Sequence, residues 1–396
     1  MSAVPPPTIR VGVVGTGFVA RHFALAARGQ PDVAVAAMLT RRRPADCGDV
    51  PDPSLLTNSA DALLDAADVV FECSGDPLHA ADVIDRALDR GLPVMTLNAE
   101  FHVTAGSYFA GRGVLTEAEG DQPGCLAALA EEAVAMGFRP RIFAAVKGFL
   151  NHDPTPEEMA YWGDRQGISL PMVTAATDGT KLQIEQALVA NGLSAGIARE
   201  GLLGPATDDL RQGAAVLADA ARAHGGAISD YLLSPALPHG VFLVAGHDDA
   251  QRAALAYVKA GDGPDYVLLK PHVFAHLEVA KTARRLAAAG GVLLDNGAAP
   301  TVGVAAVAKR DMPAGHRIAR AIGSFDLRGV AVEIAARPDH VPIGLIAGAV
   351  TRRPIARGEV VGVDALDLPD SLALTAWRSV AATAAAAPTT TAAVAP

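Results

Sequence analysis

The chain has 396 residues, of which 50 % are hydrophobic and 19 % charged, so it can form two or three domains with complete cores. Its formal net charge of -10 argues against nucleic acid or an anionic membrane surface as the main partner. Three scattered cysteines form no metal-finger spacing and fit a reducing cytoplasm, where we expect the protein to act. No apolar run is long enough to span a membrane, so we expect none.

The N-terminus has the pattern of a dinucleotide-binding fold. A β-branched strand, Ile9–Val14, is followed by a glycine turn and a predicted helix over 21–28. Gly15 permits the tight turn, Gly17 lets a pyrophosphate approach the backbone, and Ala20 keeps the helix close to the sheet. The amides at the helix start are suited to bind phosphate. We predict cofactor contacts from the turn residues Gly15, Thr16, Gly17, Phe18 and Val19.

The second predicted strand, 33–39, indicates which cofactor is preferred. An NAD site usually places an acid at the end of this strand, but here Thr40, Arg41 and Arg42 follow it, and no acid occurs before Asp46. Arginines at this point suit the 2′-phosphate of NADP(H), so we predict that these three residues bind it. A solvated basic loop is the alternative.

Strands and helices continue to alternate, with strands at 68–72 and 93–98 and a helix at 80–90 between them. This alternation predicts a doubly wound parallel sheet, in which ligands bind at the carboxyl ends of the strands. The residues at those ends should line the nicotinamide side of the cleft; they are Ser74, Gly75 and Asn98 for the cofactor and Glu100 for the substrate. For Glu100, a helix N-cap or first-turn acid is the alternative.

In the middle of the chain, Asp178-Gly179-Thr180-Lys181 combines ionisable groups at a predicted helix start. Asp178 has the chemistry of an N-cap, and Lys181 and Glu185 have the i,i+4 spacing that places both on one helix face. We predict that Lys181 polarises a substrate carbonyl, that Asp178 and Glu185 orient it, and that Thr180 contacts substrate. A capped surface helix with one Lys–Glu pair is the alternative.

Further cations follow predicted strands. Lys147 follows a strand at 142–146, and Lys270 and His272 end a strand at 266–272 that stops at a proline. If that strand is regular, Lys270 and His272 project to the same side. With Lys147, which is also a catalytic candidate, they are candidates to hold a phosphate or carboxylate of the substrate.

The C-terminal part contains a weak repeat. The segments 308–315 and 351–360 are both basic and then reach a glycine that should close a β-turn. Short β-rich runs surround them, whereas the last residues are Ala/Thr/Pro-rich. We therefore divide the chain into a nucleotide-binding domain, a catalytic domain, a β module and a disordered tail, at 1–146, 147–300, 301–378 and 379–396.

These motifs together resemble a known group of enzymes. The glycine turn and Phe71-Glu72-Cys73-Ser74-Gly75 are similar to the NAD-binding half of homoserine dehydrogenase. The segments Lys309-Arg310-Asp311-Met312-Pro313-Ala314-Gly315 and Arg353-Pro354-Ile355-Ala356-Arg357-Gly358 look like a SAF domain. With Asp178-Gly179-Thr180-Lys181 between them, the chain resembles SAF-domain oxidoreductases related to homoserine dehydrogenase, a group that includes 1-deoxy-D-xylulose 5-phosphate reductoisomerase-like enzymes.

The resemblance implies an α/β protein with an N-terminal Rossmann sheet, an α+β catalytic domain and a SAF-like module. It also implies NADP(H)-dependent hydride transfer to a small, sugar-derived or phosphorylated substrate that is anionic or polyhydroxylated, with isomerisation before reduction as one form of the reaction. A divalent metal held by carboxylates is a possible addition, and we expect a homo-oligomer. Two alternatives remain: a homoserine-dehydrogenase-type enzyme, which usually has a lysine where Ala99 and Glu100 stand, and a non-enzymatic NADP sensor.

Overall fold

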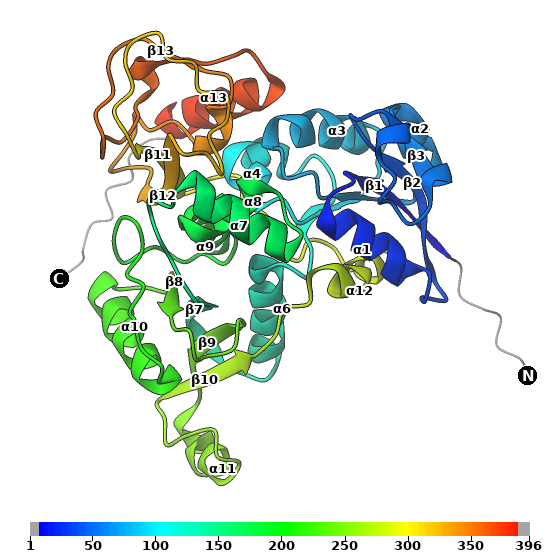
Figure 1. Ribbon diagram of the computed structural model, residues 1–396. Coiled ribbons are helices and arrows are strands. Elements are labelled where there is room, and N and C mark those ends of the chain that lie inside the picture. The colour runs from blue at the N-terminus through cyan, green and yellow to red at the C-terminus, as the bar shows by residue number, and fades with distance from the viewer. Residues whose placement is uncertain (1–7, 387–396) are drawn as a thin grey trace, which may run out of the picture.

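The computed structural model describes residues 8–386, and its N-terminal part is a single parallel sheet (Figure 1). Its six strands lie in the order β3-β2-β1-β4-β5-β6, and every neighbouring pair is parallel. The strand order reverses at β1 and β4, so the predicted doubly wound fold is confirmed and a ligand crevice is expected there. The strands are β1 (Ile9–Val14), β2 (Val33–Leu39), β3 (Leu56–Thr57), β4 (Val69–Glu72), β5 (Val94–Thr96) and β6 (Leu115–Glu117).

Helices cover both faces of this sheet because successive strand residues point to opposite sides. Val14 and Val70 belong to the core on the α2 and α3 side, whereas Val13 and Phe71 belong to the core under α1 and α12. These helices are α1 (Phe18–Ala27), α2 (Ala60–Ala66), α3 (Pro77–Asp89) and α12 (Ala275–Ala287). Shorter turns complete this part: η1 (Pro44–Asp46), η2 (Pro53–Leu55), α4 (Ala99–Phe101), the π-helical η3 (His102–Gly106) and α5 (Ser107–Phe109).

The second sheet is mixed and has the order β10-β9-β7-β8. β7 runs parallel to β8 and antiparallel to β9, which pairs antiparallel with β10. Alternate residues of β7 face different helices: Phe143 belongs to the core with α6, and Ile142 to the core with α10. The elements are β7 (Arg139–Lys147), β8 (Ile228–Leu233), β9 (Val241–Gly246), β10 (Asp265–Lys270), α6 (Gln122–Ala135), α10 (Leu210–His224), η4 (Asp249–Gln251) and α11 (Arg252–Tyr257).

Three helices occupy the middle of the molecule: α7 (Pro156–Gln166), α8 (Leu170–Thr177) and α9 (Thr180–Gly192). A capping box between Thr155 and Glu158 starts α7. Helix α9 is buried on nearly all sides, and it packs against α6, β8 and the C-terminal strands. A helix buried all round is a core element, so α9 joins the three parts of the chain (Figure 1).

The C-terminal module is β-rich, as predicted. Its two repeat segments pair with each other, since Met312 and Ile355 exchange backbone hydrogen bonds of 2.9 Å in both directions. Gly315 and Gly358 have positive φ angles of 79° and 85°, which confirms a turn glycine in each repeat. The elements are β11 (Val302–Ala308), β12 (Leu327–Glu333), η5 (Ile343–Leu345), β13 (Val350–Thr351), η6 (Val363–Ala365), β14 (Leu366–Asp367) and α13 (Leu372–Ala386).

The structure differs from the predicted division of the chain in two places. β7, which we placed in the first domain, is hydrogen-bonded within the second sheet. Helix α13 extends to Ala386, so the predicted disordered tail does not begin at 379, and 387–396 lies outside the described residues. None of the helices in 8–386 combines the length and apolar character that a membrane span needs.

Candidate active site

The glycine turn has the geometry that a dinucleotide needs. Gly15 has a φ of 122°, and a Cβ there would lie 3.2 Å from the carbonyl oxygen of Cys73, so a side chain is excluded. A Cβ at Gly17 would meet no atom within 4 Å, which leaves the start of α1 open to a ligand. Ala20 is fully buried against the sheet. The amides at the start of α1 can therefore receive a pyrophosphate.

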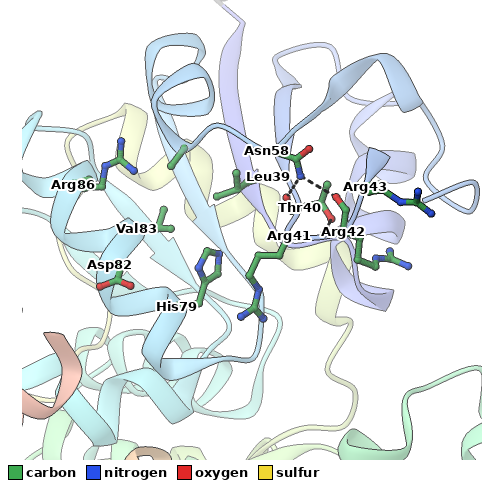
Figure 2. A pocket seen from close by; sticks show the side chains of 11 residues that line it. Leu39, Thr40, Arg41, Arg42, Arg43, Asn58, His79, Asp82, Val83 and Arg86 are labelled. Carbon is green, nitrogen blue, oxygen red and sulfur yellow. Dashed lines mark hydrogen bonds between the residues drawn. The ribbon is translucent and has the colours of Figure 1, made fainter. Parts of the chain in front are cut away.

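The basic loop after β2 lines a cavity of about 550 Å³ (Figure 2). The Asn58 side-chain amide donates to the carbonyl oxygens of Thr40 and Arg42 at 2.5 and 2.9 Å, and this holds the loop in place. Arg41 pairs with Asp76 at 2.7 Å, and the Arg42 guanidinium donates to the Thr16 hydroxyl at 3.1 Å. Among the polar lining residues, our sequence reasoning missed Asn58, His79, Asp82 and Arg86.

A buried glutamate organises the carboxyl ends of β4 and β5. Glu72 accepts hydrogen bonds from the Ser74 amide at 2.9 Å and the Asn98 side chain at 2.8 Å. Burial raises the pKa of Glu72 to about 7, although these hydrogen bonds lower it. Asn98 also caps α4 by accepting from the Phe101 amide. Asn98 is thus buried in this network, and it does not lie among the residues that line the cofactor cavity.

A larger cavity, of about 620 Å³, joins the two halves of the molecule. The glycine turn, Ser74, Gly75 and Glu100 line it from the first sheet, and Asp121 and Lys181 line it from the second part of the chain. The structure therefore brings the predicted cofactor turn and the predicted catalytic lysine to one cavity.

Lys181 is held between two carboxylates. Its ammonium lies 3.1 Å from Asp121 and 3.0 Å from Glu185, which confirms the predicted i,i+4 pairing. Burial alone would lower the pKa of Lys181, but Asp121 and Glu185 raise it well above its ordinary value. Burial raises the pKa of Glu185 to about 7, although Lys181 opposes this shift. Lys181 is therefore a cation at neutral pH.

Two residues of the central motif have other partners than we predicted. The N-cap of α9 is Gly179, and the buried Asp178 forms an ion pair with Lys309 instead of orienting Lys181. Asp178 does accept a hydrogen bond from the Thr180 amide at 2.9 Å. The Thr180 hydroxyl accepts from the Gly329 amide at 2.8 Å, so this side chain joins α9 to β12 and is not free for substrate. Local helix rules gave the spacing correctly but could not reveal a partner 131 positions away.

The other predicted cations lie in different places. Lys147 is the last residue of β7, and burial lowers its pKa. Glu185 opposes this shift, whereas Lys181 adds to it. Lys270 forms an ion pair of 2.6 Å with Glu278. β10 ends at Lys270, so His272 lies beyond the regular strand and the same-side argument does not apply. Neither Lys270 nor His272 is among the residues that line the larger cavity.

Sequence reasoning also missed buried groups beside Lys181. Asp121 caps α6 ahead of Pro123, a helix-start signal that could have revealed it. The side chains of His102 and Glu117 are fully buried with 3.5 Å between Nε2 and Oε2. Burial lowers the pKa of His102 to about 3 and raises that of Glu117 well above its ordinary range, so burial favours the neutral form of each side chain. The π-helical turn that positions His102 has no recognisable sequence signal.

The arrangement does not favour a metal. Within 8–386, no three His, Cys, Asp or Glu side chains are placed to hold an ion together. The ammonium of Lys181 bonds the two carboxylates that a cation would otherwise use.

A model of the family described as "Oxidoreductase DRL, catalytic domain" matches residues 120–279. The matched segment begins beside Asp121 and includes the second sheet and α9 with Lys181. This segment is thus similar to an oxidoreductase catalytic domain, and it follows a doubly wound parallel sheet in the chain. Curated protein sequences give no match. The predicted relation to SAF domains and to homoserine dehydrogenase stays a prediction.

Several solved structures are remotely similar to the chain. UDP-N-acetylglucosamine 3-dehydrogenase GnnA from Acidithiobacillus ferrooxidans is 14% identical, with 73% of this chain and 92% of that chain covered and a TM-score of 0.42. A probable dehydrogenase from Thermotoga maritima is 12% identical, with coverages of 72% and 90% and a TM-score of 0.40. The 3-ketoreductase KijD10 from Actinomadura kijaniata, in complex with NADP and TDP-benzene, is 17% identical, with coverages of 71% and 90% and a TM-score of 0.37.

Proposed function

We propose that the protein is an NADP(H)-dependent oxidoreductase that transfers a hydride between the cofactor and a carbonyl or alcohol carbon of a small polyhydroxylated, sugar-derived substrate. The observation that carries this proposal is the single cavity shared by the glycine turn and Lys181. The family match to an oxidoreductase catalytic domain supports the reaction class.

The cofactor assignment rests on the loop after β2. Arg41, Arg42, Arg43 and Arg86 line the cavity at this end of the fold, and arginine guanidinium groups suit a phosphate. Asn58 fixes the backbone that carries two of them. We therefore place the adenosine 2′-phosphate of NADP(H) at this loop and the pyrophosphate at the glycine turn.

The catalytic assignment rests on Lys181. A nicotinamide bound at the glycine turn would supply the hydride in the reductive direction. Lys181 would stabilise the alkoxide that develops at the substrate carbonyl and would donate the proton that completes the alcohol. Asp121 and Glu185 hold the lysine in position and keep it charged before the transfer. Glu185, whose pKa is about 7, is suited to take up a proton from water after the transfer and to pass it to Lys181.

The finer predictions concern the substrate and the assembly. Isomerisation before reduction and homoserine-dehydrogenase-type activity are the alternative reactions, and a homo-oligomer and a cytoplasmic location are further predictions. No observation in the site favours the reductoisomerase or the homoserine reaction over simple reduction of a ketone or aldehyde.

Oxidation of NADPH and of NADH should be followed with a panel of ketoses, ketose phosphates, 1-deoxy-D-xylulose 5-phosphate and aspartate semialdehyde. We expect turnover with a sugar-derived carbonyl compound and a preference for NADPH. Deuterated cofactor should deliver deuterium to the product carbon. Tight NADPH binding without turnover of any compound would favour a sensor over an enzyme.

A further inference from the structure

We propose that the α7–α8 turn, residues 167–172, forms a second wall of the dinucleotide site, where Ile168 and Met172 pack against the bound NADP(H). This inference rests on the proposed function, because it names further residues that position the same cofactor. It also gives the C-terminal module a role, since that module holds α8 in place.

The α7–α8 turn borders the cavity that also contains the glycine turn. Four of its residues line this cavity of about 620 Å³ together with the glycine turn and Lys181: Gly167, Ile168, Ser169 and Met172. A Cβ at Gly75 would lie 4.0 Å from Cε of Met172, so the methionine side chain reaches the loop that follows β4. A dinucleotide that fills this cavity from the glycine turn therefore contacts the α7–α8 turn.

Apolar side chains from both parts of the chain are exposed in this cavity. Met172 of α8 and Phe18 at the start of α1 are each 39 % exposed, and Ile168 is also only partly buried. A cofactor that covers such surface removes it from water, which contributes about 25 cal/mol per Å² of apolar area. This wall is therefore suited to the uncharged ring and ribose surfaces of a dinucleotide, whereas the arginines after β2 suit its phosphate.

The C-terminal module fixes α8 at both ends. At its start, a Cβ at Gly323 would overlap the carbonyl oxygen of Pro171, so the two backbones are in direct contact. At its end, Asp178, the C-cap of α8, forms the buried ion pair with Lys309. Lys309 also donates to the carbonyl oxygen of Ser324 at 2.7 Å, next to Gly323 in the sequence. The wall is therefore preformed, and the module sets its position.

The wall and Lys181 belong to one continuous stretch of the chain. Helix α8 ends at Thr177, and α9, which has Lys181 in its first turn, begins at Thr180. Any movement of α8 is therefore transmitted to the start of α9. Packing against Met172 positions the cofactor relative to Lys181 as well as to the glycine turn.

The test measures the dissociation constants of NADPH and NADH for the full chain by calorimetric titration. Met172→Asp and Ile168→Asp each replace an apolar contact with a carboxylate that repels the anionic dinucleotide. We expect both dissociation constants to rise about tenfold to a hundredfold in each variant. Their ratio should stay unchanged, whereas loss of an arginine from the loop after β2 should weaken NADPH alone.

Leu170→Asp is the matched control. Leu170 belongs to the same first turn of α8 and is 41 % exposed, but it is not among the residues that line the cavity. Acids in the first turn stabilise a helix, so neither Leu170→Asp nor Met172→Asp should unfold α8. Leu170→Asp should bind both cofactors as the wild type does. Met172→Leu, which keeps an apolar side chain of similar size, should retain most of the affinity.

Gly323→Ala tests the part of the C-terminal module. Its methyl group overlaps the Pro171 carbonyl and must displace the start of α8, so we expect both dissociation constants to rise about tenfold. Gly358→Ala is the control, because Gly358 has a similar positive φ of 85° but a Cβ there would meet no atom within 4 Å. Gly358→Ala should leave both dissociation constants unchanged.

The outcomes separate this inference from the proposed function. Failure of the wild type to bind NADPH would overturn the proposed function. Normal binding by the wild type with unchanged dissociation constants in Ile168→Asp and Met172→Asp would overturn the second wall and leave the proposed function standing. An equal loss of affinity in Leu170→Asp would also overturn the wall, and unchanged affinity in Gly323→Ala would overturn the part of the C-terminal module.

Discussion

At the scale of single residues, the position of Lys181 between two acids decides its chemistry. A lysine with a lowered pKa would act as a base or nucleophile, but Asp121 and Glu185 raise the pKa of Lys181 instead. An ammonium that is charged at neutral pH can stabilise an alkoxide as it forms and then donate a proton to it. The sequence could reveal the Lys181–Glu185 spacing, because it is local, but it could not reveal Asp121, which lies 60 positions away.

Replacing Lys181 with methionine tests this role. We expect turnover to fall about a hundredfold to ten-thousandfold, the usual contribution of a general acid, while the dissociation constant of NADPH stays unchanged. Single-turnover kinetics and fluorescence titration of NADPH provide the two measurements. Lys259→Met, at an exposed position, is the control. Undiminished turnover in Lys181→Met would exclude Lys181 as the acid.

Glu72 makes folding stability depend on pH. Burial raises its pKa from 4.5 to about 7, so the folded state retains a proton that the unfolded chain loses first. The contribution of Glu72 is complete below pH about 4.5 and is lost as pH rises through about 7, by about 3 kcal/mol in total. In Glu72→Gln this part of the decline should disappear. Urea unfolding of both proteins from pH 4.5 to 8 measures it, and parallel stability curves would contradict the assignment.

At the scale of elements, the loop after β2 should set cofactor preference. Arg42→Ala removes one guanidinium from the proposed 2′-phosphate site, and we expect the dissociation constant of NADPH to rise about tenfold to a hundredfold. The dissociation constant of NADH, which lacks this phosphate, should change little. Titration of both cofactors measures the ratio. Arg222→Ala is the control, because Arg222 pairs with Asp219 of α10 and Asp265 of β10, outside the nucleotide-binding sheet.

The contact between α9 and β12 should be essential for docking the C-terminal module. Thr180→Val preserves shape but leaves the buried Gly329 amide without its acceptor, which costs about 1–3 kcal/mol. We expect a lower free energy of unfolding. Thr375→Val, at an exposed hydroxyl of α13, is the control for the substitution itself. A fully stable Thr180→Val variant would show that the hydrogen bond does not hold the module.

Elements defined by local signals could be predicted from the sequence, and elements defined by distant contacts could not. β1 could be predicted because its residues are mostly β-branched. The glycine turn could be predicted because Gly15 has a positive φ that no other residue adopts easily. The repeat turns at Gly315 and Gly358 follow for the same reason. The π-helical turn at His102, the Asn58 bonds to the arginine loop and the Asp178–Lys309 pair depend on tertiary packing, which no local pattern encodes.

At the scale of the whole molecule, helices α12 and α9 join the parts of the chain that form the candidate site. Helix α12 leaves the second sheet and packs on α1 of the first, so the domains share a core (Figure 1). Helix α9 lies between α6 and the C-terminal strands, and its first turn carries Lys181. The fold class could be predicted from the alternation of strands and helices. The packing of α12 on α1 could not be predicted, because the apolar face of a helix does not indicate which element it packs against.

The central claim is that a dinucleotide on the glycine turn places its reactive ring beside Lys181. A crystal structure of the protein with NADP⁺ tests it most directly. We predict the adenosine phosphate at Arg41 and Arg42, the pyrophosphate at the start of α1, and the nicotinamide ring next to Glu100 and Lys181. A nicotinamide ring outside the shared cavity, or separated from Lys181 by packed side chains, would contradict the account.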